Sequence, residues 1–219
     1  MSGTADGASN GRALLVDYGG VLTPGVVEGW RAFEAAHDMP ERTISRMLWA
    51  AYEPDAGEEN PIVRLERGDL EIAEFERQLA AQLAEAGHDV EAEGLVRRLF
   101  SALRPEPGVG VWELVADVRD AGVPTVLVSN TWGTDAYPLD ELEALFDALV
   151  FSGRVGMRKP DREIFEHAVG LVEAELAGSV LIDDAPANVE AARSYGLTGV
   201  LHTGDVAATR RAVTDALDL

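Results

Sequence analysis

Five short apolar segments, rich in β-branched residues, recur along the chain and predict strands at 13–16, 124–128, 148–151, 179–182 and 198–201. Runs without polar alternation are typical of parallel strands that are buried on both faces. Hydrophobic residues at helical spacing predict amphipathic helices over 110–122, 138–146, 161–176, 186–196 and 205–217. This alternation of strand and helix predicts right-handed crossovers, and therefore an α/β fold with a doubly wound parallel sheet.

The connection between the first two predicted strands is far longer than one crossover needs, since it spans about 100 residues. Helical periods recur inside it, over 27–38, 41–53, 69–87 and 90–103, and "EPDAGEENP" and Gly87 interrupt them. We therefore predict a small all-helical cap over residues 25–104, inserted into a core that comprises 12–24 and 105–219. The small, polar residues 1–11 predict a disordered tail.

Charge and cysteine content narrow the classes of partner and chemistry. The 219 residues carry a formal net charge of −21, and no basic patch offsets it, so nucleic acid and anionic membranes are not expected as partners. The absence of cysteine excludes disulfides, thiolate metal sites and a cysteine nucleophile. Neither a secretion signal nor an apolar run of membrane-spanning length is evident, which favours a cytoplasmic location. The oligomeric state stays open.

Polar residues follow four of the predicted strands, at the edge where an open parallel sheet forms its ligand crevice. They are Asp17, the pair Ser129 and Asn130, Lys159, and the pair Asp183 and Asp184. Carboxylates that meet at one point repel one another unless a hard cation lies between them, and oxygen-only ligands suit Mg²⁺. Lys159, the only lysine in the chain, and Ser129 are groups that hold an anion. The combination predicts phosphoryl transfer with a carboxylate as nucleophile.

Four segments resemble, in order, the motifs of the haloacid dehalogenase superfamily of hydrolases. They are "VDYGGVLT", "VLVSN", "GMRKPDREIF" and "VLIDDAPANVEAARSYG". The long gap after the first segment is that expected for a family member with a helical cap inserted there. The resemblance extends over nearly the whole chain outside the tail, and it implies a Rossmann-like core with a cap.

The resemblance also implies how a phosphoryl group would be transferred. Asp17 is the expected nucleophile, which attacks phosphorus to form an aspartyl-phosphate that water later releases. Ser129, Lys159 and the Asn130 backbone are expected to hold the phosphoryl group, and Gly20 lets a backbone N–H approach it closely. Lys159 would also offset the charge of the nucleophile. The expected substrate is a small phosphorylated metabolite.

A second implication of the resemblance is a Mg²⁺ site. Its expected ligands are Asp17, the backbone carbonyl of Gly19, Asp184, and Asp183 either directly or through water. Asn188, one helical turn after Asp184, is expected to orient the acidic loop.

Residue 19 departs from the family pattern, because phosphatases of this family usually carry there a second Asp that protonates the leaving oxygen. Such general acid–base help is worth roughly 10²- to 10⁴-fold in rate. Gly19 keeps the backbone carbonyl but has no side chain that could transfer a proton. Thr23 and Glu28 are the nearby candidates to replace the missing Asp as proton donor. We therefore expect a substrate with an activated leaving group, such as a sugar 1-phosphate. Two alternatives stay open: a 2-haloacid dehalogenase, and a catalytically impaired phosphate-binding protein.

Overall fold

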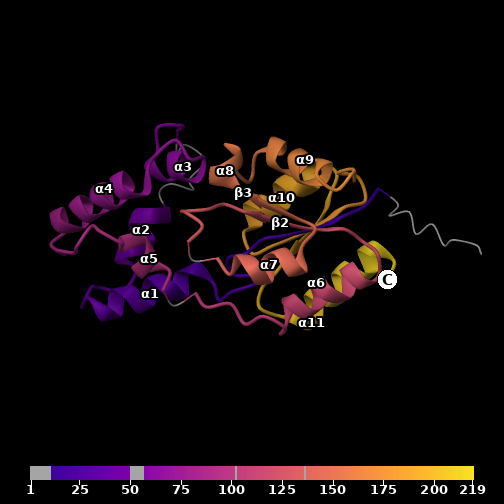
Figure 1. Cartoon of the computed structure of the whole chain (residues 1–219). Coiled ribbons are helices and arrows are strands. Elements are labelled where there is room, and N and C mark those ends of the chain that lie inside the picture. Colours follow the sequence, from indigo (N-terminus) through magenta and orange to yellow (C-terminus); the bar gives the residue numbers. More distant parts are fainter. Residues whose placement is uncertain (1–10, 50–56, 102, 136) are drawn as a thin grey trace, which may run out of the picture.

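The structure is a computed structural model that describes residues 11–49, 57–101, 103–135 and 137–219 (Figure 1). Residues 1–10 of the predicted tail lie outside these ranges, as do residues 50–53 of the predicted helix 41–53. Gly11 is described, and its carbonyl accepts a hydrogen bond from the Glu175 amide at 2.7 Å. Within the described ranges, no helix has the length and apolar character needed to cross a membrane.

A five-stranded parallel sheet forms the centre of the core and confirms the predicted fold class. Its strands are β1 (Leu14–Val16), β2 (Thr125–Ser129), β3 (Ala148–Phe151), β4 (Val180–Asp183) and β5 (Thr198–Leu201). Their order is β3-β2-β1-β4-β5, with Leu15 of β1 opposite Val126 of β2 and Leu181 of β4. The chain therefore winds to one side of β1 and then to the other, which makes the carboxyl end of β1 the switch point.

Helices cover both faces of this sheet (Figure 1). On one face lie α6 (Val111–Asp120), α7 (Leu139–Leu145) and α11 (Val206–Leu217), and on the other lie α9 (Arg162–Gly170) and α10 (Pro186–Ser194). Leu14 and Val16 of β1 pack in the first apolar cluster and Leu15 in the second. Side chains of a strand alternate between faces, so both faces being covered explains why the strands are apolar throughout.

The prediction of a helix over 161–176 was wrong for its last third. The helix α9 ends at Gly170. Glu173 has a positive φ of 55°, and the amide of Ala174 returns to the carbonyl of Val169 at 3.0 Å. A left-handed residue of this kind closes a helix by satisfying its last carbonyls. A short helix that was not predicted, α8 (Ser152–Val155), directly follows β3.

The helices between β1 and α6 gather beyond one end of the sheet (Figure 1). They are α1 (Val26–Ala36), α2 (Thr43–Trp49), α3 (Pro61–Glu66), α4 (Ile72–Glu85) and α5 (Leu95–Leu99). They share an apolar cluster of their own, which includes Trp30, Phe33, Leu79 and Leu83. We call residues 25–104 the cap, with the boundaries predicted from the sequence.

The helix α3 was not predicted, because its N-cap residue Asn60 and its first residue Pro61 fall in "EPDAGEENP", which looks like a break between helices. The Asn60 side chain accepts a hydrogen bond from the Ile62 amide at 2.9 Å, and Pro61 occupies the first turn. Asn before the first turn and Pro within it are both typical of helix starts. Since α3 has only six residues, it is too short for a helical period to reveal.

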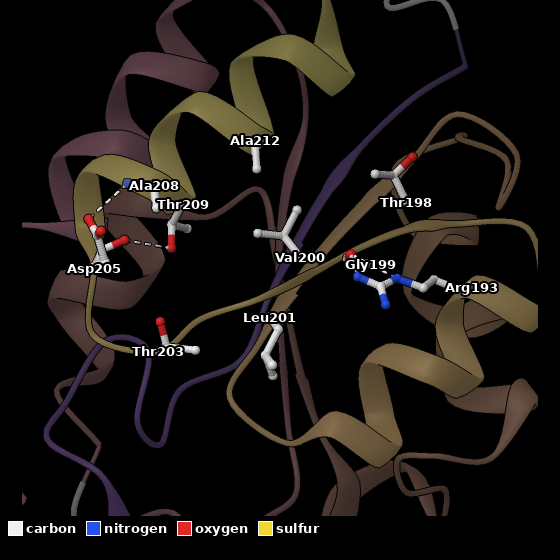
Figure 2. A pocket seen from close by; sticks show the side chains of 10 residues that line it. All are labelled: Arg193, Thr198, Gly199, Val200, Leu201, Thr203, Asp205, Ala208, Thr209 and Ala212. Atoms are coloured by element: carbon white, nitrogen blue, oxygen red, sulfur yellow. Dashed lines mark hydrogen bonds between the residues drawn. The ribbon is translucent and has the colours of Figure 1, made fainter.

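At the opposite edge from β3, strand β5 borders a cavity of about 380 Å³ that α10 and α11 flank (Figure 2). The Arg193 side chain lies beside this strand and donates from Nε and Nη2 to the carbonyl of Gly199, at 3.1 and 2.7 Å. Pairing edge carbonyls with a cationic side chain is one way to protect an exposed strand. None of the predicted site residues is among those that line this cavity.

Candidate active site

Three carboxylates converge where strands β1 and β4 end. Oxygen atoms of Asp17, Asp183 and Asp184 all lie within 4.8 Å of one another. The two strands are parallel neighbours with Val16 opposite Ile182, and the Asp17 amide donates to the Ile182 carbonyl at 2.9 Å. Asp17 and Asp183 follow paired residues of adjacent strands and must therefore lie side by side. The pairing of β1 with β4 thus brings the acids together.

The Lys159 ammonium is buried within this group. Its Nζ donates to Asp17 Oδ1 at 2.6 Å and to Asp183 Oδ2 at 2.7 Å, and the lysine side chain is 1% exposed. Burial by itself would lower the pKa of Lys159, but the Asp17 and Asp183 carboxylates outweigh it and raise the pKa well above its usual range. The lysine is therefore charged at neutral pH.

Burial and crowding also raise the pKa values of the acids, which for a carboxyl group favours the uncharged form. Burial raises the pKa of Asp17 to about 7 against the lowering effect of Lys159, and the charges of Asp183 and Asp184 add to the rise. Burial, and then the charge of Asp183, raise the pKa of Asp184 to about 6. When ionised, three carboxylates and one ammonium leave two negative charges in excess. A divalent cation would balance them, and the all-oxygen donor set fits Mg²⁺.

The loop after β4 holds the two aspartates differently. Asn188 donates from Nδ2 to both oxygens of Asp183 at 3.1 Å, and the Ala185 amide donates to Oδ1 at 2.9 Å. The orienting contact expected of Asn188 is therefore made to Asp183. Asp184 instead lies against Gly20, whose φ is +73°, and a Cβ at residue 20 would overlap the Asp184 carboxylate.

Of the predicted phosphate-binding residues, Gly20 lies in the loop after β1, and the other three lie on two segments that are tied together. Ser129 is the last residue of β2, and its hydroxyl pairs with the Tyr137 hydroxyl at 2.9 Å. The Asn130 side chain accepts from the Lys159 amide at 2.8 Å and donates to the Lys159 carbonyl at 2.9 Å. The prediction for Asn130 concerned its backbone, whereas its side chain aligns the lysine loop. The roles in phosphate binding stay predictions.

The two candidate replacements for the missing acid do different things. The Thr23 hydroxyl is buried, accepts from the Gly20 amide at 3.4 Å and donates to the Pro24 carbonyl at 3.0 Å, so it holds the loop. Glu28 is exposed in the first turn of α1. A Cβ added at Gly19 would meet only the Cγ1 of Val26, at 3.3 Å, which leaves room for a side chain if Val26 yields slightly.

Three residues around the site were missed in the sequence: Tyr137, Arg158 and Glu66. Arg158 adjoins Lys159, and its Nε donates to Glu66 Oε2 at 2.7 Å. Glu66 ends α3, so recognition of the Asn-Pro start of that helix would have brought it into consideration. No local signal marks Tyr137, because its pairing with Ser129 depends on the path of the loop after β2.

The sequence model of the haloacid dehalogenase-like hydrolase family matches residues 12–196. The chain belongs to this family. Membership in the haloacid dehalogenase-like hydrolases confirms the resemblance of the four motifs and makes the protein a hydrolase by family.

Curated relatives of this hydrolase include phosphatases. It is 32% identical over 149 residues to the sesquiterpene phosphatase astK of Aspergillus oryzae, covering 67% of this chain and 74% of the relative. A phosphorylated carbohydrates phosphatase of Thermotoga maritima is 32% identical over 49% of this chain and 52% of its own. The chain matches only 36% of the length of the pig bifunctional epoxide hydrolase 2, at 24% identity over 87% of this chain.

Solved structures show the same fold. A haloacid dehalogenase family enzyme of Bacteroides thetaiotaomicron, in complex with magnesium and inorganic phosphate, has a TM-score of 0.62 at 21% identity, over 89% of this chain and 95% of that one. An L-2-haloacid dehalogenase has a TM-score of 0.59 at 22% identity, over 87% of this chain and 83% of that one. At these identities the likeness concerns the fold and leaves the reaction to be argued from the site.

Proposed function

We propose that this hydrolase is a Mg²⁺-dependent phosphatase that acts on a small phosphorylated metabolite through an aspartyl-phosphate on Asp17. The observation that carries the proposal is the buried Lys159 ammonium between Asp17 and Asp183, with Asp184 completing the acidic group. Asp17, Asp183, Asp184 and the Gly19 carbonyl would hold the metal. When bound, Mg²⁺ supplies Lewis-acid stabilisation of charge on phosphoryl oxygens.

The reaction divides into two displacements at phosphorus. A carboxylate oxygen of Asp17 attacks, the ester P–O bond breaks, and the leaving oxygen departs with the bonding pair. Water then attacks phosphorus and displaces the Asp17 carboxylate, and inorganic phosphate is released. The proton that this water loses balances the one that the leaving oxygen takes up from solvent. Lys159 and the Ser129 hydroxyl would orient the phosphoryl oxygens, and Tyr137 would fix the direction of that hydroxyl. Such fixed donors stabilise charge without having to reorganise during the reaction.

The glycine at residue 19 points to the kind of leaving group, and therefore to the class of substrate. With glycine at residue 19, the side chain that would protonate the leaving oxygen is missing, so substrates with more acidic leaving groups should react best. A sugar 1-phosphate or another activated ester fits this requirement. The relatives named for phosphorylated carbohydrates and for sesquiterpenes support testing sugar phosphates and a phosphorylated sesquiterpene together.

Two alternatives have support of their own. The absence of an acid at residue 19 favours a 2-haloacid dehalogenase, but Asp184 would then have no evident purpose beside Asp183. Loss of the acid at residue 19 also favours a phosphate-binding protein without turnover, although the other expected positions are filled. The cytoplasmic location and the absence of nucleic-acid partners stay predictions from the sequence.

A phosphate-release assay with and without Mg²⁺ tests the proposal. Release is expected only with Mg²⁺, at least about tenfold faster on sugar 1-phosphates than on the matching 6-phosphates, because acid catalysis is worth roughly 10²- to 10⁴-fold for poor leaving groups. Gly19→Asp should narrow that ratio. Halide release from a 2-haloacid without Mg²⁺ would establish the dehalogenase instead. Capture of beryllium fluoride on Asp17 without turnover on any ester would establish the binding role.

A further inference from the structure

Glu66 of the cap lies buried against two loops of the core. Its side chain is 1% exposed. It accepts hydrogen bonds from Arg158 Nε at 2.7 Å, from Asn130 Nδ2 at 3.2 Å and from Trp132 Nε1 at 3.3 Å. Asn130 and Trp132 belong to the loop that follows β2, and Arg158 belongs to the loop that follows α8. One carboxylate of the cap therefore contacts two of the core segments that supply predicted phosphate-binding groups, those that carry Ser129 and Lys159.

The contacts of Glu66 continue directly to those groups. Asn130 follows Ser129 in the chain, and Arg158 precedes Lys159. The same Asn130 Nδ2 that donates to Glu66 also donates to the Lys159 carbonyl, while Asn130 Oδ1 accepts from the Lys159 amide. The position of Glu66 thus helps to set the plane of the Asn130 amide. That amide in turn aligns the backbone from which the Lys159 ammonium reaches Asp17.

Other contacts fasten the cap to the core at the same seam without touching this chain of hydrogen bonds. Arg67 donates from Nη2 to Asp161 Oδ2 at 2.9 Å. The backbone at Gly68 passes so close to Gly153 that a Cβ at residue 68 would lie 2.5 Å from the Gly153 carbonyl oxygen. Arg67 therefore offers a way to separate general docking of the cap from the specific contacts of Glu66.

We propose that Glu66 is a positioning residue that couples the seated cap to Asn130, Arg158 and the backbone of Lys159. The inference rests on the proposed function, since it assigns Glu66 a purpose in aligning that phosphoryl-transfer site. A second buried glutamate of the cap shows the contrast. Glu34 accepts from the backbone amides of Arg42 and Ile44 at 2.9 and 2.8 Å, and both of these donors lie within the cap itself.

The central variant is Glu66→Gln, with Glu34→Gln and Arg67→Gln as matched controls. The glutamine keeps the shape of the side chain but offers one acceptor oxygen, and its NH₂ group must face a donor at Arg158, Asn130 or Trp132. Glu34→Gln makes the same change at an equally buried acid inside the cap. Arg67→Gln removes a seam contact that does not reach Asn130.

Steady-state kinetics of phosphate release with Mg²⁺ should show whether Glu66 aligns the active-site residues or only stabilises the cap. Glu66→Gln is expected to lower kcat by about 10- to 100-fold with a much smaller change in KM, because misplacement by about 1 Å can cost roughly 10²-fold. Both controls should keep kcat within about twofold of wild type. Equal loss of kcat in Arg67→Gln or Glu34→Gln would overturn the inference, because general cap stability would then explain the effect.

Amide hydrogen exchange gives a readout that does not depend on turnover. Glu66→Gln should speed exchange in segments 129–132 and 156–161, which include the Lys159 amide bonded to Asn130, and Glu34→Gln should not. Unchanged exchange there would overturn the inference even if activity fell. If wild type releases no phosphate from any substrate, the proposed function fails, and the exchange comparison still decides whether Glu66 orders these loops.

A second variant covers the case in which Glu66→Gln does not fold. Arg158→Gln leaves Glu66 in place and removes only its cationic partner, whose side chain is 12% exposed. It should lower kcat in the same direction by about three- to tenfold, a difference of roughly 1 kcal/mol. Wild-type kcat together with wild-type exchange in 156–161 would then overturn the inference.

Discussion

The acids buried in the core and those buried in the cap are paired in different ways. In the core, Asp17 and Asp183 share the Lys159 ammonium, and Asp184 lies within 4.8 Å of both. In the cap, Glu34 and Glu76 each accept two backbone N–H groups. The first set retains an excess of negative charge, whereas each cap acid receives donors of its own.

The way in which a buried acid is paired distinguishes acids that form a reactive site from acids that stabilise the fold more clearly than the degree of burial does. The donors to Glu34 lie at the start of α2, and those to Glu76 lie at the start of α5, so both glutamates cap neighbouring helices. A carboxylate at a helix N-terminus stabilises the fold. Carboxylates that crowd together oppose folding, so such an arrangement indicates a site for a cation or for chemistry.

The largest effect that this comparison predicts belongs to Asp17→Asn. Phosphate release should fall by at least about 10³-fold, since the variant lacks the nucleophile that opens the covalent route. Thermal stability without Mg²⁺ should not fall, because one of three crowded negative charges has been removed. Phosphate release and the melting temperature of the same preparation are the measurements. A variant that keeps a tenth of the wild-type rate would show that Asp17 is not the nucleophile.

The next effect concerns Mg²⁺ and Asp184. At a concentration of 100 times its Kd, Mg²⁺ should stabilise the fold by about 2.7 kcal/mol and raise the melting temperature by roughly 5–10 °C. Asp184→Asn should reduce that rise to less than half by removing one charged ligand. Scanning calorimetry with Mg²⁺ measures this rise in melting temperature, and NaCl of equal ionic strength is the control. An undiminished rise in the variant would place the metal elsewhere.

The meeting of the acids in the core could be predicted from the sequence, for a physical reason. A parallel strand with both faces covered is apolar throughout, so its end is marked by the first polar residue. The sheet then brings those ends together. Asp17 directly follows β1 and Asp183 closes β4, so the sheet brings these two together. Lys159, which lies 142 and 24 residues from them along the chain, reaches them from the loop after α8.

The cap side is poorly predicted, because its contacts have no local sequence signal. Glu66 meets donors that lie 64, 66 and 92 residues away, none of them at helical spacing from it, and although Asn130 follows a strand end, no sequence signal pairs it with Glu66. A buried acid in a short helix looks like a solvated one until the fold is known. The same reasoning applies to Glu34 and Glu76, whose donors are backbone amides that any residue type supplies.

The smallest effect on activity belongs to Glu76→Gln. Its carboxylate accepts from the amides of Gly94 and Val96 at 3.1 and 3.0 Å, and glutamine keeps one acceptor oxygen for these two donors. The melting temperature should fall by roughly 2–10 °C, because a buried donor left unpaired costs about 1–3 kcal/mol. The kcat and the Mg²⁺-induced rise should both stay within about twofold of wild type, since none of the described contacts of Glu76 reaches the acidic group. A large loss of kcat at a temperature where the variant is fully folded would show that an acid that caps a helix within the cap also serves the reaction. The contrast between crowded acids and helix-capping acids would then no longer distinguish catalytic from structural carboxylates.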